Sequence, residues 1–351
     1  MKRILYIGSL EHGHTCLERM KALQELGHNV QGINSARSTG WLYRIFLKIS
    51  HFFGFYPDYA GLNRDIRDAI SLQKFDIVWV DKGIAVSADT LRTIKKAQPD
   101  CRLVHLNPDD PFGKYRNGWD LFLKAIPEYD VHFVARTQNL DEYAQFGAKR
   151  VFVFDRSYSK KLHRPLDLSP DEREKYGVSV GFIGTHADDR AAKIAYLIKQ
   201  GIPVAVYGND WPQGSHWDII RPHYRGPSRF GEEYVRIING MGIALHFLRH
   251  ENRDEQDSRT FELPACGAFM LAERSSKHEA LFKENEEVIF FSTADELLEK
   301  VRYFLCKPEE RARIAAGGRR RCVESGYDHQ SRMKIYVERI LQSQLNYDLI
   351  K

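Results

Sequence analysis

Short apolar runs alternate with helical patterns along most of this chain, and this alternation limits its fold more than any other feature. Residues 4–8 are apolar, 15–26 have the spacing of an amphipathic helix, and 30–33 are apolar again. A strand, a glycine-containing loop, a helix and a second strand open a doubly wound α/β domain. Further apolar runs predict more strands of one parallel sheet, near 75–80, 102–106, 131–135 and 151–154.

The second half repeats this plan. Residues 155–176 are polar, charged and contain proline, so we place a domain boundary near residue 170 and interpret the basic run within them as solvated linker. From residue 178 a strand, a Gly-Thr-His loop and a helix begin a second α/β unit. The sequence therefore predicts a Rossmann-like domain over 1–170, a second over 171–327 and a C-terminal helix within 328–351.

The overall composition excludes several classes of function. The 351 residues have a net charge of +5, which suits an anionic substrate or a membrane surface and is too small to indicate nucleic-acid binding. The five cysteines show no C-x-x-C pair and no zinc-ligand spacing, as expected of reduced cytosolic thiols. We expect a cytoplasmic protein, because neither a signal peptide nor a run of about 18 apolar residues is found.

Residues 259–273, RTFELPACGAFMLAE, combine structural signals with chemical ones. They predict a short helix over 259–266, a helix stop at Gly267 in the left-handed conformation, and a strand over 268–272 that ends at Glu273.

The start of that helix has groups suited to an anion. Asp257 and Ser258 are N-cap residues, backbone N–H groups are free at a helix start, and Arg259 adds a forked cation for phosphate oxygens. Glu262, one turn further, could accept hydrogen bonds from two vicinal hydroxyls of a ribose or a sugar. The alternative is a helix with a salt-bridged glutamate and no ligand.

The same stretch resembles the R-x-F-E-(I/L)-x-A-C-G-A-x-x-L-x-E signature of the spore-protein CgeB-like glycosyltransferases, which are relatives of the GT-B glycosyltransferases. The resemblance covers nearly the whole chain. It implies two Rossmann-like domains facing a cleft, with the nucleotide-sugar held mostly by the second, the acceptor by the first, and a C-terminal helix crossing back. It also implies a metal-independent enzyme without a permanent cofactor.

The resemblance assigns donor-binding roles in the second half. Gly184 and Thr185, followed by Arg190, match the family's F-(I/V)-G-(S/T)…R element, and backbone N–H groups with a guanidinium suit a phosphate. Trp211 ends a Y-G-N-D-W run that is similar to the family's Y-G-x-x-W. Its ring could stack on a nucleobase or simply be buried.

The E-x7-E pattern of the relatives falls on the signature helix. Glu262 would hold the ribose hydroxyls, and Asp254, eight residues earlier, takes the place of the first acid, with Asp instead of Glu. Arg259 would stabilise the departing diphosphate, and Gly267 belongs to the A-C-G element. Glu273 is a weaker candidate, because a carboxylate at a strand end is often a helix cap.

Two loops of the first half could serve the acceptor. His12 and His14 precede the first helix, where a histidine could act as a general base or be a solvated loop residue. Asp109 and Asp110 lie in N-P-D-D-P, which is similar to the family's N-D-D-P element and also forms turns readily. An inverting transfer needs a base, for which Asp109, Asp110 and His14 are the candidates. A retaining transfer needs none.

The most apolar stretch is 41–56, WLYRIFLKISHFFGFY, with basic residues at helical spacing. It predicts either a peripheral membrane contact or a core helix with a solvated basic face.

Together these features predict a glycosyltransferase that uses a nucleotide-diphosphate sugar, with a UDP-sugar as the first choice. The acceptor would be a surface polysaccharide, glycolipid, protein or small molecule. Two alternatives remain. One is an epimerase-type GT-B enzyme. The other is a non-catalytic scaffold, which is favoured by the Asp at position 254 in place of the relatives' Glu.

Overall fold

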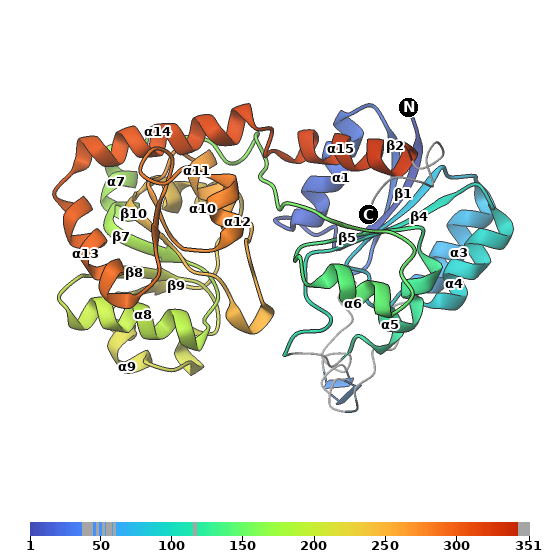
Figure 1. Ribbon diagram of the computed structural model, residues 1–351, viewed down its shortest axis with the longest axis horizontal. Helices are drawn as coiled ribbons and strands as arrows, with labels where there is room; N and C mark the ends of the chain where they lie inside the picture. Colours follow the sequence, from blue (N-terminus) through green and yellow to red (C-terminus); the bar gives the residue numbers. More distant parts are fainter. Residues whose placement is uncertain are drawn as a thin grey trace. The chain divides into compact units, whose positions relative to one another are not determined.

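The computed structural model describes residues 1–36, 45–46, 49–50, 53, 58, 61–114 and 118–342, which form two compact units (Figure 1). Unit 1 consists of the described residues of Met1–Asp155, the segment Glu251–Arg253 and helix α15 (His329–Gln342). Unit 2 consists of Arg156–His250 and Asp254–Asp328. The chain thus returns to unit 1 twice. Residues 156–170, assigned to the first domain from the sequence, lie in unit 2.

Unit 1 is built around a parallel sheet of six strands in the order β2-β1-β3-β4-β5-β6. The strands are β1 (Arg3–Gly8), β2 (Asn29–Asn34), β3 (Ile77–Asp81), β4 (Arg102–Asn107), β5 (Val131–Val134) and β6 (Val151–Val153). Strand β1 pairs with both β2 and β3, so Ile4 lies opposite Val30 on one side and Ile77 on the other. Strands β3 and β5 are buried throughout, as expected of a parallel sheet covered on both faces.

Helices cover both faces of this sheet. The helices of unit 1 are α1 (Thr15–Glu25), α3 (Leu62–Leu72), α4 (Ala88–Ala97), α5 (Asp120–Ala125), α6 (Asn139–Gln145) and α15. Because side chains alternate along a strand, Leu5 and Ile7 of β1 pack toward α3, α4 and α5. Ile4 and Tyr6 pack on the opposite face, where α1 lies beside α15 (Figure 1).

Unit 2 repeats the architecture with strand order β12-β11-β10-β7-β8-β9. The strands are β7 (Val178–Ile183), β8 (Val204–Tyr207), β9 (Tyr224–Gly226), β10 (Met241–His246), β11 (Met270–Glu273) and β12 (Ile289–Phe291). The helices are α7 (Pro170–Tyr176), α8 (Asp188–Lys199), α9 (Trp217–Ile220), α10 (Gly231–Asn239), α11 (Arg259–Ala265), α12 (Ser276–Leu281), α13 (Ala294–Leu305) and α14 (Pro308–Glu324). The two parallel sheets confirm the predicted α/β fold class.

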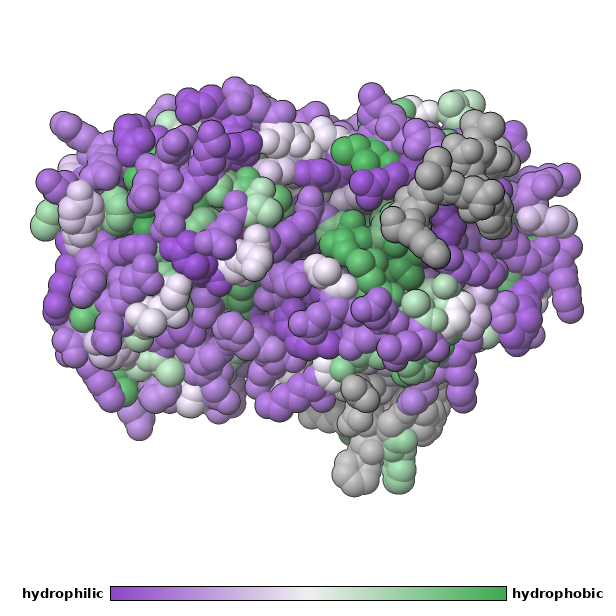
Figure 2. Space-filling view, in the orientation of Figure 1, coloured by the Kyte–Doolittle hydropathy of each residue, from purple (hydrophilic) through white to green (hydrophobic). Residues whose placement is uncertain are grey.

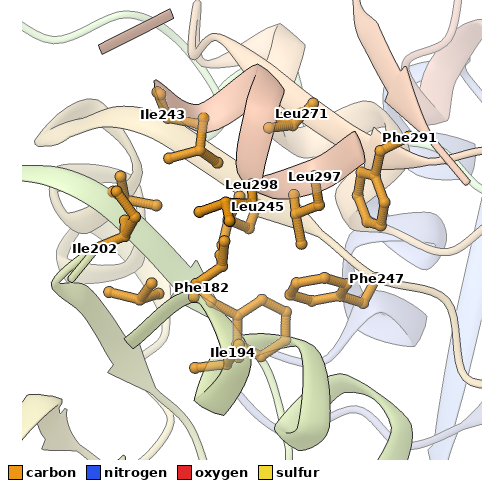
Figure 3. Close-up of a cluster of buried hydrophobic side chains, with 14 of the residues drawn as sticks. Phe182, Ile194, Ile202, Ile243, Leu245, Phe247, Leu271, Phe291, Leu297 and Leu298 are labelled. Atoms are coloured by element: carbon orange, nitrogen blue, oxygen red, sulfur yellow. The ribbon is translucent and has the colours of Figure 1, made fainter. Parts of the chain in front are cut away.

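The core of unit 2 also has two layers. On one face of the sheet, Phe182, Ile194 and Leu245 belong to a cluster that joins the strands to α8 and α13 (Figure 3). On the other face, α10 and α11 cover the sheet, with Val235 and Phe261 fully buried.

Arginines of α14 bind the carboxyl ends of neighbouring helices. Arg311 donates to the carbonyl oxygen of Leu305 at the end of α13, and Arg319 donates to that of Ala265 at the end of α11. Cations at such positions satisfy unpaired carbonyls and oppose the helix dipole. Arg311 and Arg319 therefore serve the structure of unit 2.

Candidate functional site

In unit 2 the strand order reverses between β7 and β10, which lie side by side although the chain enters β8 after β7. Ligands of open parallel sheets bind at the carboxyl ends of the strands where such a reversal occurs. Gly184 and Thr185 follow β7 directly, and Phe247 follows β10. The predicted phosphate loop therefore stands at the expected place in the sheet.

Gly184 is held tightly within this loop. Its N–H donates to the carbonyl oxygen of Tyr207, and its own carbonyl accepts the indole N–H of Trp211 over 2.9 Å. A Cβ at position 184 would lie 2.8 Å from the ring of Phe182 and 3.3 Å from the guanidinium carbon of Arg259. Only glycine lets the backbone and Arg259 approach this closely.

Trp211 does not face a ligand. Its side chain is fully buried in the unit 2 core, with its ring edge-on to Phe182 and His186. The stacking role considered from the sequence is therefore wrong, and burial is the correct alternative. Inside the core, the indole N–H of Trp211 finds its hydrogen-bond acceptor in the Gly184 carbonyl.

Arg259 is oriented by Asp257. One guanidinium nitrogen of Arg259 lies 2.8 Å from Asp257 Oδ2, and the Arg259 backbone N–H donates to Oδ1 over 2.7 Å. His246, which is fully buried, bonds the same Oδ1 from the end of β10 at 2.9 Å. Burial alone would raise the pKa of Asp257, but His246 and Arg259 hold it well below its usual range. Asp257 therefore remains a carboxylate that fixes Arg259.

Arg190 lies close enough to both Arg259 and Arg249 to feel their charges. Arg190 is 1% exposed and donates to the carbonyl oxygens of Thr185 and Phe247, at 2.9 and 3.3 Å. Burial and then the charge of Arg259, with a smaller effect of Arg249, lower the pKa of Arg190 to about 10. The Nε atoms of all three arginines have no hydrogen-bond partner among the residues that the structure describes. Crowded cations with unused donors indicate a site for a multiply charged anion.

The amino end of α11 is closed to a ligand, contrary to the prediction. Its first N–H groups are used inside the protein: Arg259 bonds the Asp257 side chain, Thr260 bonds the Asp257 carbonyl, and Phe261 and Glu262 bond that of Ser258. Ser258 occupies the N-cap position without a side-chain hydrogen bond. The Arg259 side chain, which is 25% exposed, rather than this helix end, is available to an anion.

Glu262 lies one turn into α11 and is oriented by two residues that sequence reasoning missed. Its Oε2 accepts the hydroxyl of Tyr234 over 2.6 Å, and its Oε1 faces Nε2 of His163 at 3.9 Å. Burial and the Glu262 charge raise the pKa of Tyr234 well above its usual value, so the phenol remains a donor. The prediction that His163 lies in a solvated linker is wrong, because this segment folds onto unit 2 and leaves His163 only 7% exposed.

Three other predicted residues of unit 2 have structural partners. Gly267 adopts φ +76° at the end of α11, as predicted for a left-handed helix stop. The N–H of Asp254 donates to the Arg249 carbonyl over 3.2 Å and closes the loop that carries Arg249. Glu273 is buried and accepts from the Leu248 N–H at 3.1 Å.

In unit 1 the N-P-D-D-P loop follows β4 and meets the loop after β3. Asp109 Oδ2 lies 2.5 Å from Lys82 Nζ, and the Asp109 side chain remains 35% exposed. The Asp109 N–H donates to the side chain of the buried Asn107. Asp109 is therefore a carboxylate at a strand end that solvent and substrate can reach.

Asp110 is engaged elsewhere. Its fully buried carboxylate forms a double hydrogen bond with Arg253, at 2.5 and 2.8 Å, and accepts from Asn139 and from the Phe112 N–H. Burial would raise the pKa of Asp110, but these donors hold it below its usual value. The prediction that Asp110 could act as a base is wrong, since its lone pairs are occupied within unit 1.

His14 occupies the N-cap position of α1, after β1. Its Nδ1 is 2.7 Å from the Ser9 hydroxyl, its Nε2 is 3.7 Å from Glu11, and 44% of the side chain is exposed. His12 is exposed in the same loop. Strands β1 and β3 flank the point at which the strand order of this sheet reverses, so His14 lies where a ligand of unit 1 would bind.

Most of the stretch 41–56 lies outside the described residues. Within it, Ile45, Ile49 and Phe53 are described and are 47%, 47% and 70% exposed. The face of the protein seen in Figure 2 is largely hydrophilic, with several smaller apolar patches. Across the described part of the chain, no helix is both long enough and apolar enough to cross a membrane. The described residues also contain no group of three or more His, Cys, Asp or Glu side chains that could hold a metal ion.

Comparison with known proteins finds similarities, one of them confined to the second half of the chain. Residues 190–338 match a family model described as glycosyl transferase-like. The chain is 26% identical over 209 residues to a lipoyl synthase from Tolumonas auensis, covering 59% of this chain and 56% of that protein. It is 22% identical over 222 residues to the spore protein CgeB from Bacillus subtilis, covering 59% of this chain and 66% of that protein. The chain thus spans less than two thirds of either relative.

Solved structures share the fold over nearly the whole chain. Sucrose-phosphate synthase from Thermosynechococcus elongatus superposes with a TM-score of 0.66 and 11% identity, over 98% of this chain and 99% of that one. Anabaena HepE in complex with UDP-glucose gives 0.66 and 13%, over 98% and 100%. AviGT4, a glycosyltransferase involved in avilamycin A biosynthesis, gives 0.60 and 14%, over 97% and 98%. These likenesses establish the GT-B fold that the sequence resemblance implied.

Proposed function

We propose that this chain, which has the GT-B fold and whose residues 190–338 match a glycosyl transferase-like family model, transfers a sugar from a nucleotide-diphosphate donor to an acceptor. The observation that carries the proposal is the group of Arg190, Arg249 and Arg259 around the Gly184 loop. A non-catalytic scaffold has no use for three crowded guanidinium groups with unused donors.

The mechanism assigns distinct roles to the residues of unit 2. Arg259, fixed by Asp257, would neutralise the charge that develops on the diphosphate as it departs, and stabilisation of this kind is among the largest effects in catalysis. Glu262, oriented by Tyr234, would accept the ribose hydroxyls. We propose a UDP-sugar as the donor, an assignment supported by the UDP-glucose complex of the similar HepE protein.

Unit 1 would supply the acceptor side. If the transfer inverts the anomeric centre, Asp109 or His14 would remove the proton of the acceptor hydroxyl, since both are exposed at carboxyl ends of strands. The acceptor class, whether polysaccharide, glycolipid, protein or small molecule, is left open. We also propose that the reaction needs neither a metal nor a permanent cofactor, because the arginines can carry the diphosphate charge.

The test is calorimetric titration of the wild type with UDP, GDP, ADP, CMP and dTDP, followed by two variants. Glu262→Ala should weaken both the nucleoside diphosphate and the corresponding nucleoside, whereas Arg259→Gln should weaken only the diphosphate form. Arg236→Gln is a matched control, because Arg236 pairs with Glu172 on α7. If none of the five nucleotides binds the wild type, the proposed donor site is wrong.

A further inference from the structure

One group of charged side chains at the carboxyl ends of β10 and β11 has no role in the proposed function. Glu273, the last residue of β11, accepts Nε2 of His250 at 3.0 Å and Nζ of Lys193 at 3.2 Å on its Oε1. Its Oε2 accepts the Leu248 N–H. His250, Lys193 and one backbone donor therefore converge on this buried carboxylate. Burial alone would raise the pKa of Glu273, but these three partners lower it to about 2.

His250 is the outward-facing member of this group. Its side chain is 57% exposed, whereas that of Glu273 is 9% exposed. With Nε2 directed at Glu273, the other ring nitrogen, Nδ1, has no partner among the described residues of either unit. A histidine whose Nε2–H is bound to a carboxylate presents Nδ1 as a donor only when the ring is protonated.

The position of His250 connects it to the arginine group. It follows Arg249 directly, and both lie in the loop after β10, at the strand reversal. Arg190 bonds the Phe247 carbonyl at the start of this loop. Asp189, the neighbour of Arg190 on α8, places Oδ2 3.7 Å from His250 Nε2.

We propose that His250, positioned by Glu273, is a donor-binding residue whose imidazolium Nδ1–H bonds a phosphate oxygen of the nucleotide-sugar. This inference rests on the proposed function and adds a residue to its donor site. Glu273 is a positioning residue: it does not touch the donor, and it keeps the ring both oriented and protonated.

The charges around the ring favour the protonated form. The hydrogen bond that His250 donates to Glu273 raises the pKa of His250 above its usual value, and burial opposes this. The charges of Glu273 and Asp189 raise it further, whereas that of Lys193 lowers it. Donor affinity should therefore be greatest at low pH and should decline as the pH rises through the His250 pKa.

The experiment measures the Kd of UDP-glucose by calorimetry from about pH 6 to about pH 8.5. UDP-glucose is the probe because both phosphates are esterified and keep a constant charge in this range, whereas the terminal phosphate of UDP titrates near pH 6. The wild type should lose about tenfold in affinity across the range, the size expected for one charge-assisted hydrogen bond.

Three variants test the assignment. His250→Gln should bind at low pH about tenfold more weakly than the wild type and should show no decline with pH. Glu273→Gln, which keeps an oxygen acceptor but removes the charge, should move the decline to lower pH. His223→Gln, a histidine of unit 2 far along the chain from this loop, should keep the wild-type profile. Uridine should bind all four proteins without this pH dependence.

The outcomes separate the two proposals. If the wild type binds no nucleotide or nucleotide-sugar, the proposed function fails, and this inference fails with it. If the wild type binds UDP-glucose but His250→Gln keeps the same pH profile, or loses UDP-glucose and uridine equally at every pH, the donor site stands and only the role of His250 is overturned.

Discussion

Trp211 donates its indole N–H to the carbonyl oxygen of Gly184 across 2.9 Å, from a position with no exposed surface. The Gly184 loop, which lies against Arg259, is therefore fixed by a hydrogen bond from a core residue. A tryptophan at a strand end suggested contact with a base, but it serves the phosphate loop indirectly.

Replacing this ring tests that arrangement. Trp211→Phe keeps an aromatic side chain but leaves the buried Gly184 carbonyl without its donor, which should cost about 1–3 kcal/mol of unfolding free energy. Urea denaturation measures this, with Trp217→Phe, a partly buried ring on α9, as the control. If Trp211→Phe lowered UDP affinity strongly without changing stability, the ring would have to contact the ligand after all.

Gly208 packs against the same loop. It adopts φ +140°, and a Cβ there would overlap the carbonyl oxygen of Gly184. Gly208→Ala should therefore destabilise unit 2 by more than Gly201→Ala, which also has a positive φ, +83°, but has open space around it. Gly201→Ala should cost about 1–2 kcal/mol from backbone strain alone. Equal losses in thermal or urea denaturation would show that the close approach does not matter.

The two neighbouring aspartates of unit 1 should respond differently to the same change. Asp110→Asn removes the fully buried one of the two carboxylates that pair with Arg253, the other being Glu142, and should cost about 3 kcal/mol of stability. Asp109→Asn breaks a half-exposed pair with Lys82 and should cost at most about 1 kcal/mol. For an inverting transfer that uses Asp109 as the base, kcat should nevertheless fall about 100-fold. NMR of the product shows whether the anomeric configuration is inverted, and the kcat prediction applies only if it is.

A buried histidine pair should make stability sensitive to acid. His105 and His132 face each other at 3.3 Å between Nδ1 atoms, and their Nε2 atoms bond the carbonyl oxygens of Lys82 and Ile126. Burial lowers the pKa of His105 to about 3 and that of His132 well below its usual value. Below about pH 6.5 the unfolded chain binds protons that the native pair does not, so the native state loses stability as the pH falls toward 3.

The loss should be about 1.4 kcal/mol per pH unit for each histidine. Urea denaturation at about pH 7, 6 and 5 gives the slope for the wild type and for His105→Gln, whose amide does not titrate. The variant should show a slope smaller by about one proton. Identical slopes would mean that His105 is protonated equally in both states.

Metal removal should leave the reaction unaffected. With Arg190, Arg249 and Arg259 available for the diphosphate charge, we expect donor turnover to persist in excess EDTA and to change little on addition of magnesium or manganese. Turnover measured as nucleotide release checks this. A loss of activity with EDTA that magnesium restores would contradict metal-independence.

The sheets were predictable because parallel strands are apolar throughout, and residues 4–8, 178–183 and 241–246 stand out from their polar loops. The exception is β9, whose three residues Tyr224, Arg225 and Gly226 carry no strand pattern. The positions of Gly184, Arg259 and Gly267 were predictable too, since strand ends and a left-handed turn have local signals.

Partners distant in sequence were not predictable. Asp110 resembles a candidate base until Arg253, 143 residues later, is seen bound to it. His163 and Tyr234 give no local sign that they meet at Glu262, because that depends on how residues 156–170 fold onto unit 2. Arg249 and His250 come three and four residues after the buried strand β10, and two basic residues so close to a strand end are a local signal that could have been used.

Helix α15 covers one face of the unit 1 sheet, although all of unit 2 is encoded between that sheet and the helix. On the ribosome, Tyr6, Trp79 and Phe133 are therefore synthesised long before Met333 and Tyr336, which cover them. The first unit to leave the ribosome is the last that can complete its core. A fragment ending at Asp155 should expose this apolar face and aggregate. Unit 2, in contrast, can assemble its own core before α15 is synthesised.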